Sequence, residues 1–194
     1  MKFEILKLDK VTSTNDAAID LIKEKKKSSG LIYANAQIRG RGTHGRQWIS
    51  NDGNLFASLF FPLKKKFPSF VEFSIINPVI ISEVIIKYCE IKSINLKFPN
   101  DIFLNRKKIC GILQETITFN KMNYLIVGIG LNTISNPTIT NNYEATNILK
   151  ETKKRVNIKS IIEQIIYSYE NFFMNLKYYN FINFKKKAEN MALK

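Results

Sequence analysis

The residues best suited to chemistry in this sequence form a glycine-rich basic segment, residues 39–46 (RGRGTHGR), which is followed by the only tryptophan, Trp48. Glycines let a backbone approach a ligand closely and leave N–H groups free to bind oxyanions. The arginines would neutralise phosphate or carboxylate, and the indole of Trp48 could cover a flat ring. A basic turn that binds nothing and an RNA-binding segment are the alternatives. The segment lacks the Walker A pattern, which excludes a P-loop.

A second polar cluster lies at a predicted bend. Residues 97–101 (KFPND) end one apolar run, and residues 108–113 (KICGIL) open the next, so Lys108 would lie near the same edge of a hairpin. A lysine, an amide and a carboxylate at one bend could hold phosphates and a magnesium ion, because magnesium takes a few oxygen ligands together with phosphate. The alternative is a Pro-Asn-Asp turn with solvated lysines.

Two further segments carry weaker signals. Residues 128–132 (GIGLN) end a strand-like run, where the glycines would allow close approach of a ligand and Asn132 could bind an amide or adenine edge. The polar run at residues 13–15 (STN) could bind a small polar head group, or it could simply cap a helix.

The usual arrangements for covalent catalysis are missing from the sequence. There is no G-x-S-x-G elbow, and the one histidine, His44, has no evident triad partner. The two cysteines, Cys89 and Cys110, are too few for a disulfide framework or a Cys/His zinc site, and we expect Cys110 in the core. The remaining candidates are cationic and glycine-rich, which suits stabilisation of a phosphorylated intermediate.

The hydropathy pattern predicts the elements that position these residues. We expect strands at 3–8, 31–36, 55–63, 95–103, 108–119 and 123–130, with a hairpin turn at 105–107. We expect helices at 17–27, 73–88 and 158–177, and loop or short helix at 135–155. Paired strands with interspersed helices predict one α+β domain rather than a doubly wound sheet.

The net charge of +14 comes from 30 basic and 16 acidic residues, and lysine outnumbers arginine 25 to 5. Surfaces that read bases or clamp phosphates favour arginine, so this excess favours a lysine-solvated surface that would attract an acidic partner. The start, MKFEILKLDK, has no apolar h-region, and polar residues interrupt the longest apolar stretch, 73–89. We therefore expect neither a secretory signal nor a membrane span, and a cytoplasmic location.

Four motifs in this order resemble the biotin protein ligases: residues 13–15 (STN), 40–48 (GRGTHGRQW), 97–102 with 108–113 (KFPNDI, KICGIL), and 128–132 (GIGLN). The resemblance runs from about residue 3 to 177. It implies a two-layer α+β catalytic domain like that of class II aminoacyl-tRNA synthetases, with a mixed, largely antiparallel sheet packed with helices. It also implies an enzyme that activates biotin with ATP and Mg²⁺ to biotinyl-5′-AMP and passes the biotinyl group to one lysine of a biotin carboxyl carrier protein.

The resemblance assigns a role to each matching residue. The catalytic residues would be Lys108, Arg41 and Lys97. The biotin pocket would contain Ser13, Thr14, Asn15, Gln37, Gly40, Arg41, Gly42, Thr43, Lys108 and Gly111. The nucleotide would contact Arg46, Trp48, Asn100, Asp101 and Asn132, with magnesium held through the phosphates and by Asn100 or Asp101. The expected partner is the carrier of acetyl-CoA carboxylase, with no specific DNA and no membrane, and the protein would be a monomer or homodimer.

The sequence departs from the family pattern in three respects. Thr43 and His44 stand where many members carry two further arginines, which leaves open whether the adenylate is retained. Phe98 replaces the more usual tryptophan. The ends of the chain leave no room for an N-terminal helix-turn-helix or a C-terminal SH3-like domain, so we expect one catalytic domain over residues 1–194, either a monofunctional form or a truncated chain.

Two other functions compete with biotin ligation. A lipoate or octanoyl ligase or transferase of the related fold would carry a stretch like R-R-x-S-G-G-G-x-V-x-H-D, which the sequence lacks. A basic RNA-binding module would expose aromatic residues between basic ones on a sheet, whereas the aromatic-rich residues 55–63 (LFASLFFPL) are expected in a buried strand.

Overall fold

A seven-stranded sheet organises the computed structural model, which describes residues 1–89, 94–137 and 144–193. The strand order is β1-β2-β3-β7-β6-β5-β4. The strands are β1 (Glu4–Val11), β2 (Gly30–Gln37), β3 (Leu55–Pro62), β4 (Ile94–Lys97), β5 (Asp101–Leu104), β6 (Lys107–Phe119) and β7 (Met122–Leu131). Among the strands of the described residues, β1 and β2 pair in parallel and the other neighbouring pairs are antiparallel. The predicted α+β class with a mixed, largely antiparallel sheet is confirmed.

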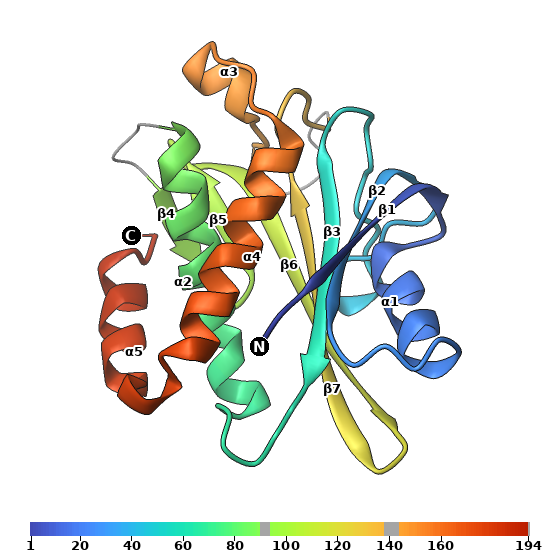
Figure 1. The fold of residues 1–194 in the computed structure, drawn as a ribbon. Helices are drawn as coiled ribbons and strands as arrows, with labels where there is room; N and C mark the ends of the chain where they lie inside the picture. The colour runs from blue at the N-terminus through green and yellow to red at the C-terminus, as the bar shows by residue number, and fades with distance from the viewer. Residues whose placement is uncertain (90–93, 138–143, 194) are drawn as a thin grey trace.

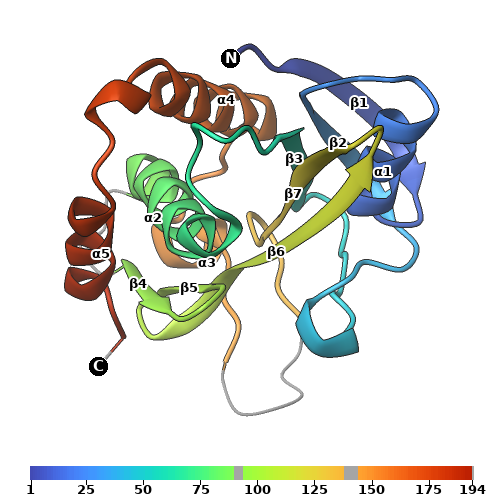
Figure 2. The same ribbon diagram turned by 90° about the horizontal axis from the view of Figure 1, so that it is seen from below.

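Helices cover both faces of this sheet. They are α1 (Thr14–Lys23), α2 (Phe70–Cys89), α3 (Ile148–Thr152), α4 (Ile158–Met174) and α5 (Phe181–Asn190). Figures 1 and 2 show α2, α4 and α5 grouped on one side and α1 on the other. Alternate residues of β2, β3 and β7 point to opposite faces, so one set packs under α1 and the next set joins the larger core. Strand β3 is therefore buried along its whole length, as residues 55–63 predicted.

Most predicted elements are found within three residues of their expected ends, and the exceptions are one strand and one helix. The expected strand at 95–103 is two antiparallel strands, β4 and β5, because the chain reverses at Phe98-Pro99 and proline cannot donate to a strand ladder. Helix α1 begins at Thr14 rather than 17, because the Ser13 side chain accepts a hydrogen bond from the Asn15 backbone N–H (3.2 Å) and caps the helix. It ends at Lys23, before the lysine run.

The sequence analysis missed α5, whose short amphipathic pattern is preceded by a capping residue. The side chain of Asn180 accepts from the backbone N–H of Ile182 (2.9 Å), and this cap was the available signal. In the segment expected to be loop or short helix, α3 is the short helix, while residues 138–143 lie outside the described residues. The hairpin turn at 105–107 is confirmed, with Asn105 and Arg106 at positive φ as a two-residue turn between antiparallel strands requires.

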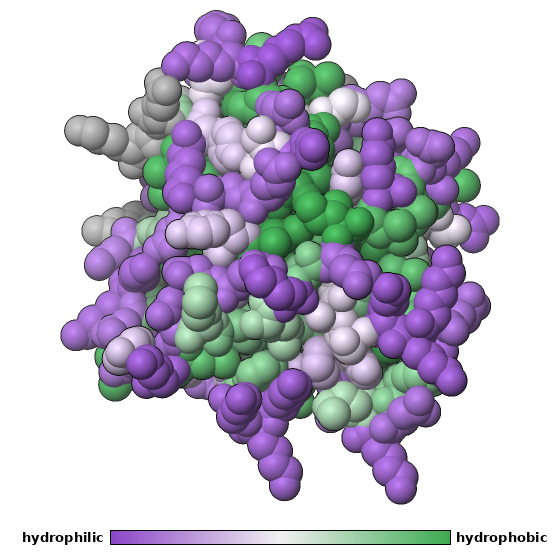
Figure 3. All heavy atoms as spheres, viewed as in Figure 1, coloured by the Kyte–Doolittle hydropathy of each residue, from purple (hydrophilic) through white to green (hydrophobic). Residues whose placement is uncertain are grey.

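The surface agrees with a lysine-solvated exterior. Figure 3 shows hydrophilic side chains spread over the visible face, around a smaller apolar area. Among the described residues, no helix combines the length and the apolar character that crossing a membrane requires.

A polar contact inside the core ties α4 to α2. Tyr169 is fully buried, and its hydroxyl donates to Asn77 Oδ1 (2.8 Å). Tyr169→Phe leaves that oxygen buried without a donor, so we expect the free energy of unfolding to fall by about 1–3 kcal/mol. Urea unfolding measures the change. The matched control is Tyr167→Phe, since Tyr167 is 63% exposed on the same helix. Equal losses for the two variants would contradict the prediction.

Candidate functional site

A cavity of about 100 Å³ lies where β6 and β7 meet the start of α1 and the glycine-rich segment. Thirteen of the residues singled out in the sequence line it: Ser13, Thr14, Asn15, Gln37, Arg41, Gly42, Thr43, Arg46, Trp48, Asn100, Asp101, Lys108 and Gly111. These residues come from four separated segments of the chain. The fold therefore brings most of the proposed site residues to one place.

One end of the cavity is a hydrogen-bonded polar pocket. Gln37 Oε1 accepts from the backbone N–H and the hydroxyl of Thr14 (2.8 and 3.2 Å). The hydroxyl of Ser58, on β3, lies 2.5 Å from Asn15 Oδ1 and 2.8 Å from Thr14 Oγ1. Ser13 both caps α1 and lines the cavity. The sequence analysis missed Ser58, although a lone serine inside an otherwise apolar buried strand needs a polar partner and was a usable signal.

The glycines of β6 and β7 make room for side chains that lie on the sheet. Gly111 and Gly130 are register partners, and a Cβ on either would collide with the indole of Trp48. A Cβ on Gly128 would collide with the amide of Asn15. The two glycines of the G-x-G pattern, Gly128 and Gly130, therefore leave the space that the side chains of Asn15 and Trp48 occupy. In the described part of the chain, the Trp48 Nε1–H is buried and meets no acceptor.

The other end of the cavity carries a shielded ion pair. Lys108 Nζ lies 2.7 Å from Asp101 Oδ1, and their side chains are 14% and 15% exposed. The Lys108 ammonium also lies 5.4 Å from the ring centroid of Trp48. The prediction that residues 97–101 and 108–113 lie at the same edge of a hairpin is confirmed, because Asp101 pairs with Gly111 across β5 and β6. Lys108 is thus a largely buried cation fixed before any ligand arrives.

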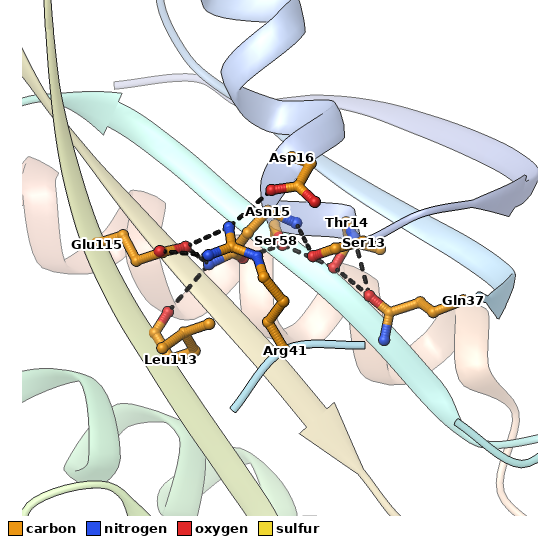
Figure 4. A network of polar contacts seen from close by, with 9 residues as sticks. All are labelled: Ser13, Thr14, Asn15, Asp16, Gln37, Arg41, Ser58, Leu113 and Glu115. Atoms are coloured by element: carbon orange, nitrogen blue, oxygen red, sulfur yellow. Dashed lines mark hydrogen bonds and ion pairs between the residues drawn. The ribbon is translucent and has the colours of Figure 1, made fainter. Parts of the chain in front are cut away.

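Arg41, from the glycine-rich segment, is held between two carboxylates that the sequence analysis missed (Figure 4). Its two terminal nitrogens donate to the two oxygens of Glu115 (2.6 and 2.8 Å), and one of them also lies 2.8 Å from Asp16. Burial lowers the pKa of Arg41, but the bonds and charges of these carboxylates outweigh burial and raise it. Arg46 is exposed, and its Nη2 lies 3.2 Å from Thr43 Oγ1.

Three of the proposed site residues do not line the cavity. Lys97 lies on β4, with its ammonium 5.9 Å from the ring centroid of Phe103. Gly40 is buried, and its backbone carbonyl accepts from the Trp48 N–H (2.8 Å). Asn132 is only 2% exposed, and its side-chain N–H donates to the Thr146 carbonyl (3.0 Å). The roles expected for these residues stay predictions.

The available ligands suit a metal that arrives on a phosphate. Among the described residues, no group of three His, Cys, Asp or Glu side chains could hold a metal ion. Asp101 and Asn100 place one carboxylate and one amide in the cavity. Magnesium is commonly held by one or two protein ligands together with phosphates, so this donor set fits phosphate-bound magnesium.

The cysteines are not candidates for nucleophiles. Both Cys89 and Cys110 are buried, and Cys110 lies in the core as expected. Burial raises the pKa of Cys89 to about 11 and raises that of Cys110 further above its ordinary value. Neither thiol therefore ionises near neutral pH.

Known proteins share both this sequence and this fold. The model of the biotin/lipoate A/B protein ligase family matches residues 7–132. The bifunctional ligase/repressor BirA of Escherichia coli (strain K12) is 34% identical over 124 residues, which cover 63% of this chain and 38% of the relative. The BirA of Bacillus subtilis (strain 168) is 27% identical over 197 residues, covering 95% and 58%. The chain thus spans well under two thirds of the length of these relatives.

Solved structures match nearly the whole chain. The biotin protein ligase from Aquifex aeolicus in complex with biotin and ATP superposes with a TM-score of 0.80 at 28% identity, covering 98% of this chain and 78% of that one. The Leishmania major biotin protein ligase in complex with biotinyl-5-AMP gives a TM-score of 0.83 at 26% identity, covering 98% and 83%. With the family model matching more than half of its residues, the chain belongs to the biotin/lipoate A/B protein ligase family.

Proposed function

We propose that this protein is a biotin protein ligase. It would use ATP to convert biotin to biotinyl-5′-AMP and then transfer the biotinyl group to one lysine of a biotin carboxyl carrier protein. The observation that carries this proposal is one cavity that joins a polar pocket, lined by Thr14 and Asn15 and supported by their hydrogen bonds with Ser58, to the shielded cation Lys108. Similarity to ligases solved with biotin, ATP and biotinyl-5-AMP supports it.

The polar pocket favours biotin over lipoate as the acid. The ureido ring of biotin offers N–H donors and a carbonyl acceptor, which match the polar side chains of Ser13, Thr14 and Asn15 that line the cavity. The dithiolane of lipoate has no strong hydrogen-bonding group, so it would gain none of the hydrogen bonds that these side chains can add to those they make within the protein. A site built for a hydrogen-bonding ligand rejects an analogue that lacks those groups by large factors.

The cationic end suits the adenylation step. The biotin carboxylate oxygen attacks the α-phosphorus of ATP, the new C–O–P bond forms, and pyrophosphate leaves. Lys108 and Arg41 would stabilise the negative charge that grows on the phosphoryl oxygens, because charges fixed beforehand need no reorganisation during the reaction. Magnesium, carried on the phosphates near Asp101, would supply further positive charge.

The transfer step needs no nucleophile from this chain. The neutral amine of the carrier lysine attacks the acyl carbon of biotinyl-5′-AMP, AMP leaves with the anhydride oxygen, and the surplus amine proton passes to solvent. The net charge of +14 would attract an acidic carrier. A cytoplasmic location and the acetyl-CoA carboxylase carrier as acceptor are part of the same proposal.

Pyrophosphate exchange into ATP tests the proposed activity. Labelled pyrophosphate is incubated with protein, Mg-ATP and either biotin, lipoate or no acid. Exchange that requires biotin supports the proposal, and a biotinyl mass gain on a carrier domain, absent when its lysine is replaced, supports the transfer step. Exchange with lipoate alone would favour the lipoate ligase alternative. No exchange with either acid from folded protein would overturn the enzyme proposal.

A further inference from the structure

One carboxylate connects the polar pocket to the glycine-rich segment. Glu115, on β6, accepts a forked pair of hydrogen bonds from Arg41 at 2.6 and 2.8 Å. The same side chain accepts from Asn15 Nδ2 at 2.7 Å. Figure 4 shows it on its strand, facing the Arg41 guanidinium and the Asn15 side chain. Glu115 therefore contacts both the polar pocket, through Asn15, and Arg41.

Glu115 does not itself line the main cavity. It lines a second hollow, together with His44 and Arg46 of the glycine-rich segment. Its side chain is 27% exposed. Any effect of Glu115 on a ligand in the cavity must therefore pass through Arg41 or Asn15, which do line it.

The carboxylate determines which way the Asn15 amide faces. Two acceptors, Glu115 Oε2 and the Leu113 carbonyl (3.4 Å), surround Asn15 Nδ2. The amide oxygen is consequently turned toward the hydroxyl of Ser58, and the side chain is buried. Reversing the amide would place its oxygen against a carboxylate, so an acceptor at position 115 fixes the donor and acceptor pattern that the pocket presents.

The same carboxylate fixes Arg41. A forked arginine–carboxylate pair is directional as well as strong, because both hydrogen bonds are charge-assisted and their planes must align. Asp16 also contacts one of the Arg41 nitrogens, at 2.8 Å. Among the residues drawn in Figure 4, its carboxylate has no hydrogen bond to the Asn15 side chain. Glu115 and Asp16 thus share one arginine, while Glu115 also holds the amide.

We propose that Glu115 is a positioning residue for biotin recognition, which holds the Asn15 amide and the Arg41 guanidinium in the arrangement that the ligand meets. This inference rests on the proposed function. Glutamine at 115 keeps the shape of the side chain but has one acceptor oxygen, and its N–H₂ faces a donor of Arg41 or Asn15. Glu115→Gln therefore weakens the contacts with Arg41 and Asn15 without creating a cavity.

The test compares Glu115→Gln with Asp16→Asn in biotin-dependent pyrophosphate exchange. Loss of one hydrogen bond to a charged group corresponds to at least about a tenfold change in an equilibrium constant. We expect Glu115→Gln to raise the KM for biotin at least tenfold, through Asn15, and to lower kcat as well, through Arg41. We expect Asp16→Asn to raise that KM less than threefold. Calorimetric titration with biotin alone gives the corresponding Kd without turnover.

A double-mutant cycle shows whether the effect passes through the amide. In an Asn15→Ala background, Glu115→Gln is expected to change the Kd for biotin much less than in the wild type, because one of the two partners through which Glu115 acts is already gone. Thermal unfolding of each variant checks the fold. If Glu115→Gln does not fold, Glu115→Asp, which keeps the charge and shortens the reach, is measured instead with the same expected rise in KM.

Each remaining result has a definite meaning. A wild-type KM for biotin in a folded position-115 variant overturns the inference, whatever the change in kcat, because Glu115 would then have no part in biotin recognition. Full additivity with Asn15→Ala overturns it as well. If the wild type shows neither exchange nor biotin binding, the proposed function itself is refuted. This outcome differs from failure of the Glu115 inference, because it is seen in the wild type without any variant.

Discussion

Replacing Lys108 with alanine is expected to reduce biotin-dependent pyrophosphate exchange by about 10²–10³-fold, the usual loss when one preorganised stabilising group is removed. The ammonium of Lys108 is only 14% exposed and is fixed 2.7 Å from Asp101, so no mobile surface cation can take its place. Initial rates of exchange at saturating biotin and ATP measure the loss. The expected change is chiefly in kcat, because the charge that Lys108 opposes grows during phosphoryl attack.

The matched control for this prediction is the neighbouring lysine on the same strand. Lys107 pairs with Glu144 at 3.0 Å, has a side chain that is 35% exposed, and does not line the cavity. Lys107→Ala should keep exchange within about twofold, since exposed ion pairs contribute little. Circular dichroism and thermal unfolding confirm that Lys108→Ala is folded at the assay temperature. Equal losses in the two variants, or less than a threefold loss in Lys108→Ala, would refute the assigned role.

Adding one methyl group at Gly128 is expected to damage biotin binding almost as severely. The new Cβ would collide with the Asn15 amide, which Ser58 and Glu115 hold from two sides, so the amide has to leave its position. Displacement of a binding group by about 1 Å can cost on the order of 10²-fold. We expect the KM for biotin to rise by about that factor. Overpacking should also lower the free energy of unfolding by about 1–3 kcal/mol.

A second variant on β7 separates binding from stability. Ile126 lies two residues from Gly128 on the same face and packs with α1, away from the amide. Ile126→Val should lose about 0.5–1.5 kcal/mol of stability and leave the KM for biotin unchanged. If Gly128→Ala binds biotin as the wild type does, or if Ile126→Val weakens binding to the same extent, the collision with Asn15 is not what matters.

The chemistry at the hairpin edge was predictable because its residues are close in sequence and share adjacent strands. The motifs at 97–101 and 108–113 flank a turn, and antiparallel pairing of β5 with β6 brings Asp101 beside Lys108 and Gly111. The Pro-Asn-Asp turn, offered as the alternative, also exists between β4 and β5. Lys108 is nevertheless shielded rather than solvated, because its ammonium lies against Asp101 and near the ring of Trp48, which comes from a distant segment of the chain.

By itself, the sequence determined most of the segments that form strands and helices, though not α5 or the division of β4 from β5, and which segments carry the candidate chemistry. Alternating apolar residues predicted the strands, apolar residues at helical spacing predicted the helices, and Ser13 was a candidate cap for the first helix. Tertiary structure decided the partners of the polar groups. Glu115 lies 74 residues from Arg41 and 100 from Asn15, and their contact depends on the order and register of strands and on the path of the glycine-rich segment. Contacts between residues so far apart in sequence leave no periodic pattern in it. From the sequence alone, Glu115 is therefore indistinguishable from a solvent-exposed glutamate on a strand.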